Sequence, residues 1–396
     1  MHLNQVENNL FLFIILLVAF MPGLIIDLYV PSLNFISIFF HATSILTKLT
    51  ISSCLSGYAI GQLIFGFLSD VLGRKKMLIF GLIIFLIASA LTFITTNIYV
   101  FIFVRFIQGL SAASASVITK VIIADNYINY KKLEHGMIYF GIISAVPPVI
   151  APVVGGYIAY FFGWQGAFSI YILYSSILIL LVTFFLKETY TNKVTFAFIA
   201  NSLKDYLTNK EFILVIVATG LCYSPTAIFN TIGSLLIQEV LGKNPVVFGY
   251  TAMILGLGMI LGSILTRIVY VNKKFLLNFS AIIMLIVSVL ILIVNYKMKP
   301  SLSVIVPSFL IFFLLDGLTF PIFLSMAIQM FHKTKGMTSS FIGAGFILIS
   351  SISSLLVSVL DFSSMFIIAC LLFIITLMYL ITVNLLLNHQ QLKLAS

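Results

Sequence analysis

Apolar positions along the chain gather into long runs that are separated by short polar segments. Each run has 20 residues or more, and about 20 apolar residues are enough for one helix to cross the hydrocarbon core of a bilayer. The runs lie near residues 10–33, 46–68, 77–96, 98–122, 137–161, 165–186, 212–236, 247–269, 275–295, 302–326, 340–360 and 365–386. The pattern predicts an all-α integral membrane protein with twelve transmembrane helices.

The longest polar break, residues 187–211, divides these runs six and six. We interpret it as a cytoplasmic linker between an N-terminal six-helix half, residues 1–186, and a C-terminal six-helix half, residues 212–396. The second and the eighth runs are both spaced by glycines and both lead into a basic loop. This similarity favours an internal duplication, although the glycines could equally serve close helix packing alone.

Composition excludes several classes of protein. The chain is 61% hydrophobic and 8% charged, against about 25% charged in a soluble domain. Its 21 lysines and arginines are scattered over short loops, which does not predict a nucleic-acid surface. Cys54, Cys222 and Cys370 lack the spacing of a metal site, and no metal or cofactor is expected. Motifs of nucleotide sites and of hydrolases are missing, so neither an enzyme nor an ATP-driven pump is predicted.

The distribution of basic residues predicts how the chain crosses the membrane. Fourteen lysines and arginines fall on the side that carries the termini, and four, including Lys48, fall in the opposite loops. Basic residues are enriched in cytoplasmic loops. We therefore expect both termini in the cytoplasm of a bacterial cell, with the chain in the inner membrane as a monomer.

Three ionisable residues lie well inside predicted spans: Asp27, Arg105 and Asp316. A charge near the centre of a span costs about 2.5–3.5 kcal/mol, so such residues usually have a partner or line a cavity. From the helical rise, Asp27 and Arg105 lie at a similar depth, roughly 7–9 Å to the outer side of the midplane.

We expect Asp27 and Arg105 to form an ion pair that can open. Burial favours the protonated carboxyl, whereas a nearby guanidinium favours the carboxylate, so movement of Arg105 would make Asp27 bind or release a proton. A permanent ion pair, or an Asp27 that reaches the lipid headgroups, is the alternative.

Prolines mark both acidic positions. Pro31 has no N–H for the carbonyl of Asp27, and Pro321 likewise frees the carbonyl of Gly317, next to Asp316. Asp316 is therefore a second candidate site for a proton or a cation. A buried acid that is hydrogen-bonded to neighbouring hydroxyl groups is the other interpretation.

Four segments resemble the major facilitator superfamily and, within it, the twelve-helix drug:proton antiporters of the Bcr/CflA type. Residues 27–33, DLYVPSL, are similar to the D-x-Y-x-P-[SA]-L signature, and residues 105–109, RFIQG, to R-x-x-Q-G. Residues 66–76, GFLSDVLGRKK, resemble the G-x-L-[SA]-D-[RK]-x-G-R-[RK] loop but have Val71 at a position that is usually basic. Residues 151–156, APVVGG, resemble G-P-x-x-G-G with alanine in the first place.

The resemblance implies the major facilitator fold, in which two halves rock about a central site, and it implicates Asp27 and Arg105 in proton coupling. Gating residues are expected in the loop and in the fifth helix: Gly66, Asp70, Gly73, Arg74, Pro152, Gly155 and Gly156. In the loop, Asp70 could accept hydrogen bonds from a helix N-terminus and Arg74 could pair with a carboxylate. Plain anchoring by the basic residues and a purely structural bend are the alternatives.

These features predict a proton-coupled secondary transporter that exports small amphipathic compounds by alternating access. Proton-coupled uptake of a nutrient or a siderophore on the same fold is the alternative. The expected partners are protons, a small-molecule substrate and the lipid bilayer. Substrate contacts are expected from side chains that could face a cavity, unless they pack or face lipid: Tyr29, Gln108, Tyr223, Phe229 and Asn230.

Overall fold

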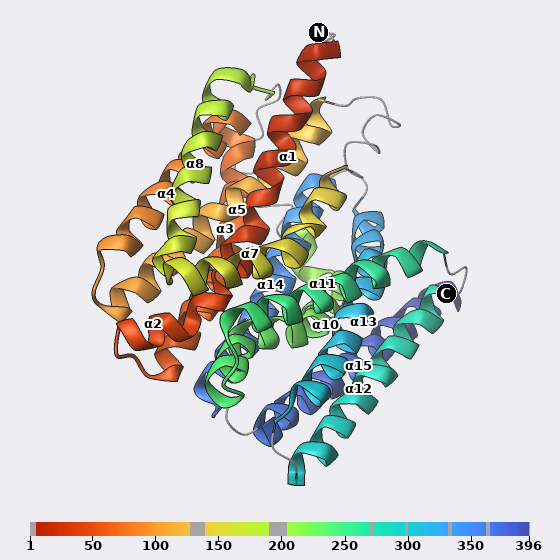
Figure 1. Cartoon of the computed structure of the whole chain (residues 1–396). Helices are drawn as coiled ribbons and strands as arrows, with labels where there is room; N and C mark the ends of the chain where they lie inside the picture. Colours follow the sequence, from red (N-terminus) through yellow and green to blue (C-terminus); the bar gives the residue numbers. More distant parts are fainter. Residues whose placement is uncertain are drawn as a thin grey trace.

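The computed structural model of the chain consists of long helices packed side by side (Figure 1). It describes residues 5–126, 139–189, 204–268, 272–297, 300–331, 335–361 and 365–395. Within these ranges, twelve helical segments are long and apolar enough to cross a membrane, which confirms the twelve predicted spans.

The N-terminal six spans are formed by α1 to α8. Their bounds are α1 Gln5–Asp27, η1 Val30–Ser32, α2 Leu33–Phe39, α3 Ser44–Leu72, α4 Arg74–Ile94, α5 Ile98–Asn126, α7 Pro147–Phe162 and α8 Gln165–Phe185. The first span is broken into α1, the 3-10 turn η1 and α2. The fifth span starts at Tyr139 and bends at Val146, because α7 begins with a proline at its first position, where no N–H is required.

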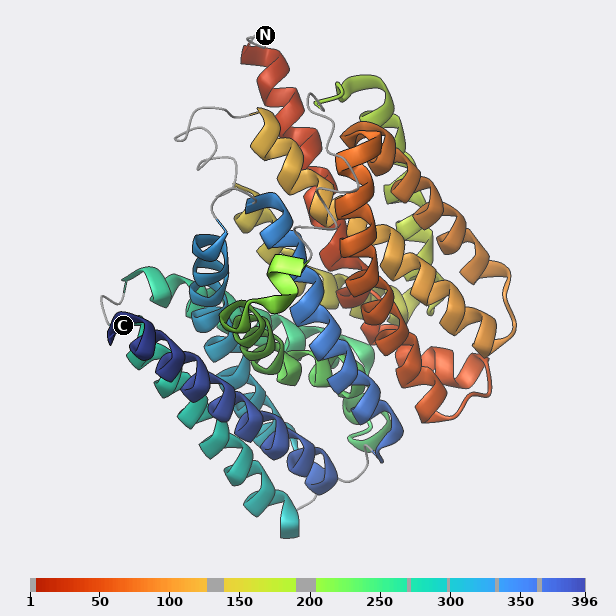
Figure 2. The same cartoon turned by 180° about the vertical axis from the view of Figure 1, so that it is seen from behind.

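The C-terminal six spans are formed by α10 to α15. Their bounds are α10 Lys210–Leu235, α11 Pro245–Ile268, α12 Lys273–Lys297, α13 Leu302–Met330, α14 Lys335–Val359 and α15 Met365–Ala395, with a π-helical turn at Leu236–Val240 after α10. The two sets of helices form two bodies, which are seen from opposite sides in Figures 1 and 2. The bodies meet mainly along α3 with α14 and along α7 with α11.

Glycines let corresponding helices approach closely within each half. A Cβ atom at Gly57 of α3 would lie 2.1 Å from the carbonyl oxygen of Phe106 in α5, and one at Gly262 of α11 would lie 1.9 Å from that of Leu314 in α13. Neither position has room for a methyl group. The second and fourth spans of each half therefore approach each other closely at a glycine in the same way.

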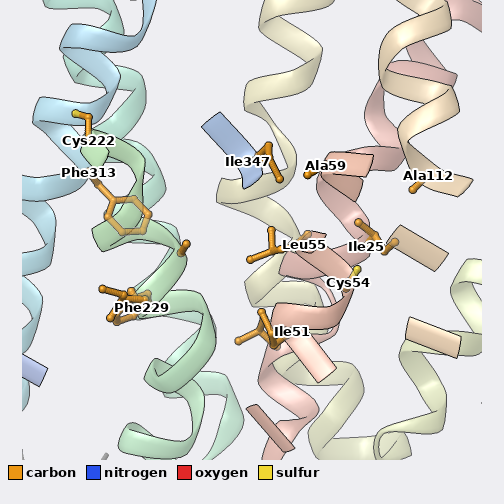
Figure 3. Close-up of a cluster of buried hydrophobic side chains, with 14 of the residues drawn as sticks. Ile25, Ile51, Cys54, Leu55, Ala59, Ala112, Cys222, Phe229, Phe313 and Ile347 are labelled. Atoms are coloured by element: carbon orange, nitrogen blue, oxygen red, sulfur yellow. The ribbon is translucent and has the colours of Figure 1, made fainter. Parts of the chain in front are cut away.

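Apolar side chains fill both bodies and the seam between them. Figure 3 shows Phe229 and Phe313 in the C-terminal half, and it shows Ile347 of α14 next to Leu55 and Ala59 of α3. The contact between α14 and α3 joins the two halves, so the seam itself is part of the apolar core.

Candidate functional site

Asp27 lies at the C-terminal end of α1, at the point where the first span is broken. The helix ends at Asp27 and η1 follows, so the interruption that Pro31 predicts is present. The side chain of Asp27 is partly exposed. Within the described residues it has neither an ion pair nor a hydrogen bond. Its carboxyl group is therefore accessible to a proton or to a ligand.

The interruption of the first span after Asp27 leaves one carbonyl group of α1 free to accept hydrogen bonds from side chains. The N–H of Tyr29 donates to the carbonyl of Ile26 at 3.0 Å, rather than to that of Ile25 four residues back. The Ile25 carbonyl instead accepts from Nη2 of Arg105 at 3.0 Å and from the hydroxyl of Tyr171 at 3.1 Å. Arg105 thus reaches the end of α1, at the depth that counting along the helices predicts.

The expected ion pair between Asp27 and Arg105, which was predicted to open and close, is not formed in this conformation. Nη1 of Arg105 donates to Oε1 of Gln108 at 2.9 Å, and the guanidinium lies over the ring of Tyr29, 4.1 Å from its centroid. Its Nε has no hydrogen-bond partner among the described residues. The positive charge is therefore held close to the end of α1 by a carbonyl, an amide and a ring, and Asp27 is left unpaired.

Buried polar groups extend this arrangement to two further helices. Nε2 of Gln108 donates to Oγ of Ser89 in α4 at 2.9 Å, and the hydroxyl groups of Tyr29 and Thr50 in α3 lie 2.6 Å apart. All four side chains are buried. Four helices, α1, α3, α4 and α5, are therefore hydrogen-bonded around Arg105.

Asp316 is buried inside α13, with 1% of its surface exposed. Oδ2 accepts a long hydrogen bond of 3.5 Å from the hydroxyl of Thr226 in α10, and Oδ1 has no partner among the described residues. The carbonyl of Gly317, which Pro321 was predicted to free, accepts from the hydroxyl of Ser263 in α11 at 3.0 Å. One oxygen of this buried carboxyl group therefore has no partner among the described residues and could bind a proton.

Tyr223 lies close enough to Asp27 and Asp316 to interact with both electrostatically, although it bonds to neither. It belongs to α10, and its side chain is partly exposed. Its ring packs edge-on against Phe346 of α14 at a centroid distance of 5.5 Å. Asn230, almost two turns further along α10, is also partly exposed. Of the five predicted substrate contacts, only Tyr223 and Asn230 are partly exposed in this conformation.

The other three predicted substrate contacts are fully buried. Tyr29 and Gln108 bind Arg105, as described above, and Phe229 packs in the core of the C-terminal half, 5.0 Å from the ring of Phe309 (Figure 3). These side chains have a packing role that their sequence positions do not reveal. A substrate could contact them only after a rearrangement.

The loop between α3 and α4 has the geometry of a tight turn with an ionic lock. Gly73 joins the two helices with a φ of 104°, a conformation that favours glycine. Arg74 forms an ion pair with Asp70 one turn earlier, and its Nε lies 3.2 Å from Oδ2 of Asp125 at the end of α5. The predicted pairing of Arg74 with a carboxylate is present. Gly66 lies at the seam, where a Cβ atom would be 3.4 Å from Oγ of Ser340 in α14.

Sequence reasoning missed Asp125 and Glu188. Oε1 of Glu188 accepts from the backbone N–H groups of Arg74 at 2.9 Å and of Lys75 at 3.3 Å. The carboxylate thereby caps the N-terminus of α4, where the helix dipole favours a negative charge. More than 100 positions separate Glu188 from its partners, and no spacing in the sequence signals such a contact.

The small residues of α7 lie at two different contacts. A Cβ atom at Gly155 would be 2.3 Å from the carbonyl oxygen of Leu28, which follows α1 in the same half. One at Gly156 would be 2.8 Å from the carbonyl oxygen of Pro245, at the start of α11 in the other half. The carbonyl of Pro152 also faces α11. Helix α7 therefore packs on the broken first span with one edge and on the opposite half with the other.

Replacing Gly156 with leucine should reduce the transport rate at least tenfold, because the new side chain would hold α7 and α11 apart. The rate in reconstituted vesicles measures the effect. Gly141→Leu is the matched control, since a Cβ atom at Gly141 meets nothing within 4 Å. Equal rates for the two variants would show that the α7–α11 contact does not have to close during transport.

Lys48 departs from its predicted place. The sequence places it in an outer loop, whereas the structure places it in α3 with its side chain fully buried. The predicted run near residues 46–68 already includes this lysine, and α3 begins two residues earlier, at Ser44, so counting Lys48 with the outer loop was the error.

The family model described as Major Facilitator Superfamily matches residues 15–341 of the chain. The chain belongs to this superfamily. An uncharacterized MFS-type transporter (YdgK) of Bacillus subtilis is 28% identical over 355 residues, which cover 88% of each chain. A bicyclomycin resistance protein homolog of Haemophilus influenzae is 26% identical, covering 72% of this chain and 71% of the relative. Multidrug resistance protein MdtL of Citrobacter koseri is 30% identical over 55% of each chain.

Solved major facilitator structures share the fold at low sequence identity. A D-xylose-proton symporter aligns with a TM-score of 0.72 and 17% identity, covering 93% of this chain and 97% of its own. The human organic anion transporter MFSD10 aligns with a TM-score of 0.66 and 16% identity, over 97% and 100% of the two chains. These likenesses concern the fold alone.

The expectations about family and class are confirmed. This member of the major facilitator superfamily is a multi-pass membrane transporter and not an enzyme. The resistance proteins among its relatives agree with the resemblance to antiporters of the Bcr/CflA type.

Proposed function

We propose that this transporter exports small amphipathic compounds across the bacterial inner membrane in exchange for protons, with both termini in the cytoplasm. The observation that carries the proposal is the state of Asp27. Asp27 is partly exposed and its carboxyl group is unpaired at the break in α1, while the buried guanidinium of Arg105 in α5 binds the carbonyl of Ile25, two residues before Asp27.

Asp27 has the chemistry that coupling requires. An acid at membrane depth without a fixed partner can be neutralised by a proton or by a group of the substrate, but not by both at once. Approach of the Arg105 guanidinium during the transport cycle would favour release of the proton. A small change in solvent access then shifts the balance, so substrate and proton compete for one group.

Asp316 is proposed as a second site for a proton. Its unbonded Oδ1 and its complete burial favour the neutral carboxyl in the present conformation. The partly exposed Tyr223 lies near both acids and belongs to the opposite half from Asp27. A substrate bound beside Tyr223 would therefore lie close to acidic groups of both halves of the protein.

Gating is assigned to the contacts between halves and to the loop after α3. The ion pairs of Arg74 hold together the ends of α3, α4 and α5, so a movement of these helix ends during transport would have to break them. Gly155 and Gly156 keep α7 in contact with the broken first span and with α11. We infer that movement of α7 against α11 is transmitted to the end of α1, where Asp27 lies.

Export rather than uptake is supported by the relatives, which include a bicyclomycin resistance protein homolog and a multidrug resistance protein. The deciding experiment uses inside-out vesicles with an imposed pH gradient and a panel of amphipathic antibiotics. We expect at least one compound to accumulate in the vesicles and to release protons from them. Accumulation of a compound only in right-side-out vesicles, driven by proton entry, would instead establish uptake.

A further inference from the structure

Lys48 is the feature that the transport mechanism above leaves unused. It lies about one turn after the start of α3, and its side chain is 0% exposed. Lys48 lies at the end of the helix bundle where α3 begins and α14 ends. This end is opposite the termini, because α15 follows α14 and runs from this end back to the C-terminus. A fully buried lysine is rare unless its ammonium group is hydrogen-bonded.

The partners of Lys48 belong to the other half of the protein. Its Nζ donates to the carbonyl of Leu360 at 2.6 Å and to that of Val357 at 3.4 Å, at the C-terminal end of α14. The last carbonyls of a helix lack partners within the helix and form the negative end of its dipole. Asp361 and Glu239 also lie within electrostatic range of the ammonium. The charge is thus neutralised almost entirely from the C-terminal half.

The seam next to Lys48 is lined by hydroxyl groups. Oγ of Ser52, one turn further along α3, lies 2.6 Å from Oγ of Ser354 and 2.9 Å from that of Ser358, both in α14. Thr231 of α10 also bonds to Ser354, at 2.6 Å. Each of these groups can exchange its partner for water when the helices separate. An apolar seam could not do so at comparable cost.

We propose that Lys48 is a gating residue that closes the seam between α3 and α14 at the end opposite the termini. In the closed state its ammonium binds the end of α14, and in the open state it is hydrated. This inference rests on the proposed function in one respect only: the end of the bundle that carries Lys48 is the outer end if both termini are cytoplasmic. A neutral side chain at position 48 would leave the helix end without its cation and shift the halves toward separation.

Cross-linking between the halves tests this inference without substrate or a proton gradient. The introduced pair Ser52→Cys and Ser354→Cys, in a background in which Cys54, Cys222 and Cys370 are replaced by alanine, should form a disulfide when the seam is closed. Lys48→Met should slow its formation about tenfold, which corresponds to about 1.4 kcal/mol. Lys48→Arg, which keeps the charge and the donors, should stay within about twofold of the parent.

Lys243→Met is the matched control, because it removes an exposed lysine from the same end of the protein and should leave the rate unchanged. Equal cross-linking rates with methionine and lysine at position 48 would overturn the proposal. So would failure of Lys48→Met and Lys48→Gln to insert while Lys48→Arg inserts normally, since the lysine would then serve folding alone. Because no transport is measured, a failure here leaves the coupling role of Asp27 untouched.

Discussion

Replacing Asp27 with asparagine should abolish proton-driven export while the protein remains inserted and folded. The amide has nearly the shape of the carboxyl but cannot exchange a proton, and no ion pair or hydrogen bond of the described residues is lost. We expect the initial rate of substrate accumulation in energised inside-out vesicles to fall at least a hundredfold.

Asp205→Asn is the matched control for this prediction. It makes the same chemical change at an exposed position between the two halves. The control should transport at the parental rate. A full rate for Asp27→Asn under a pH gradient would refute the coupling role of Asp27. Asp316 would then be the remaining candidate, and Asp316→Asn would be measured in the same way.

Replacing Arg105 with methionine should both stop transport and lower the thermal stability of the protein. The change leaves Oε1 of Gln108 without its partner in the interior, while the carbonyl of Ile25 keeps the hydroxyl of Tyr171 as a donor. Each buried acceptor that is left unsatisfied costs about 1–3 kcal/mol. We expect a lower unfolding temperature in detergent and a loss of proton-coupled transport of at least a hundredfold.

Arg105→Lys separates the contribution of the charge from that of the donor geometry. A lysine keeps the positive charge but cannot bind the carbonyl and the amide with two separate nitrogens while lying flat on a ring. It should recover part of the stability and little of the transport. Lys76→Met, at an exposed position in the first turn of α4, is the control for loss of a positive charge. An unfolding temperature of Arg105→Met equal to that of this control would contradict the network described around Arg105.

Much of the site was predictable because its signals are local. Asp27, Arg105 and Asp316 are charges in apolar runs, and the helical rise places the first two at one depth. Gly73, one of the expected gating residues, has a positive φ in the turn between α3 and α4. Local sequence signals did not predict which group each of these side chains binds. The carbonyl that Arg105 binds is that of Ile25, which is released because Tyr29 bonds to Ile26 at the helix end.

The sequence by itself determined the number of spans and their six-and-six division around the polar break, because apolar length and charge along a helix are properties of neighbouring residues. Only the tertiary structure decided which groups meet. Glu188 caps α4, Lys48 binds the end of α14, and Gly156 faces α11 across the seam. Such contacts depend on the packing of helices far apart in the chain and on the few backbone groups that helix ends leave unbonded, and neither is encoded in spacing.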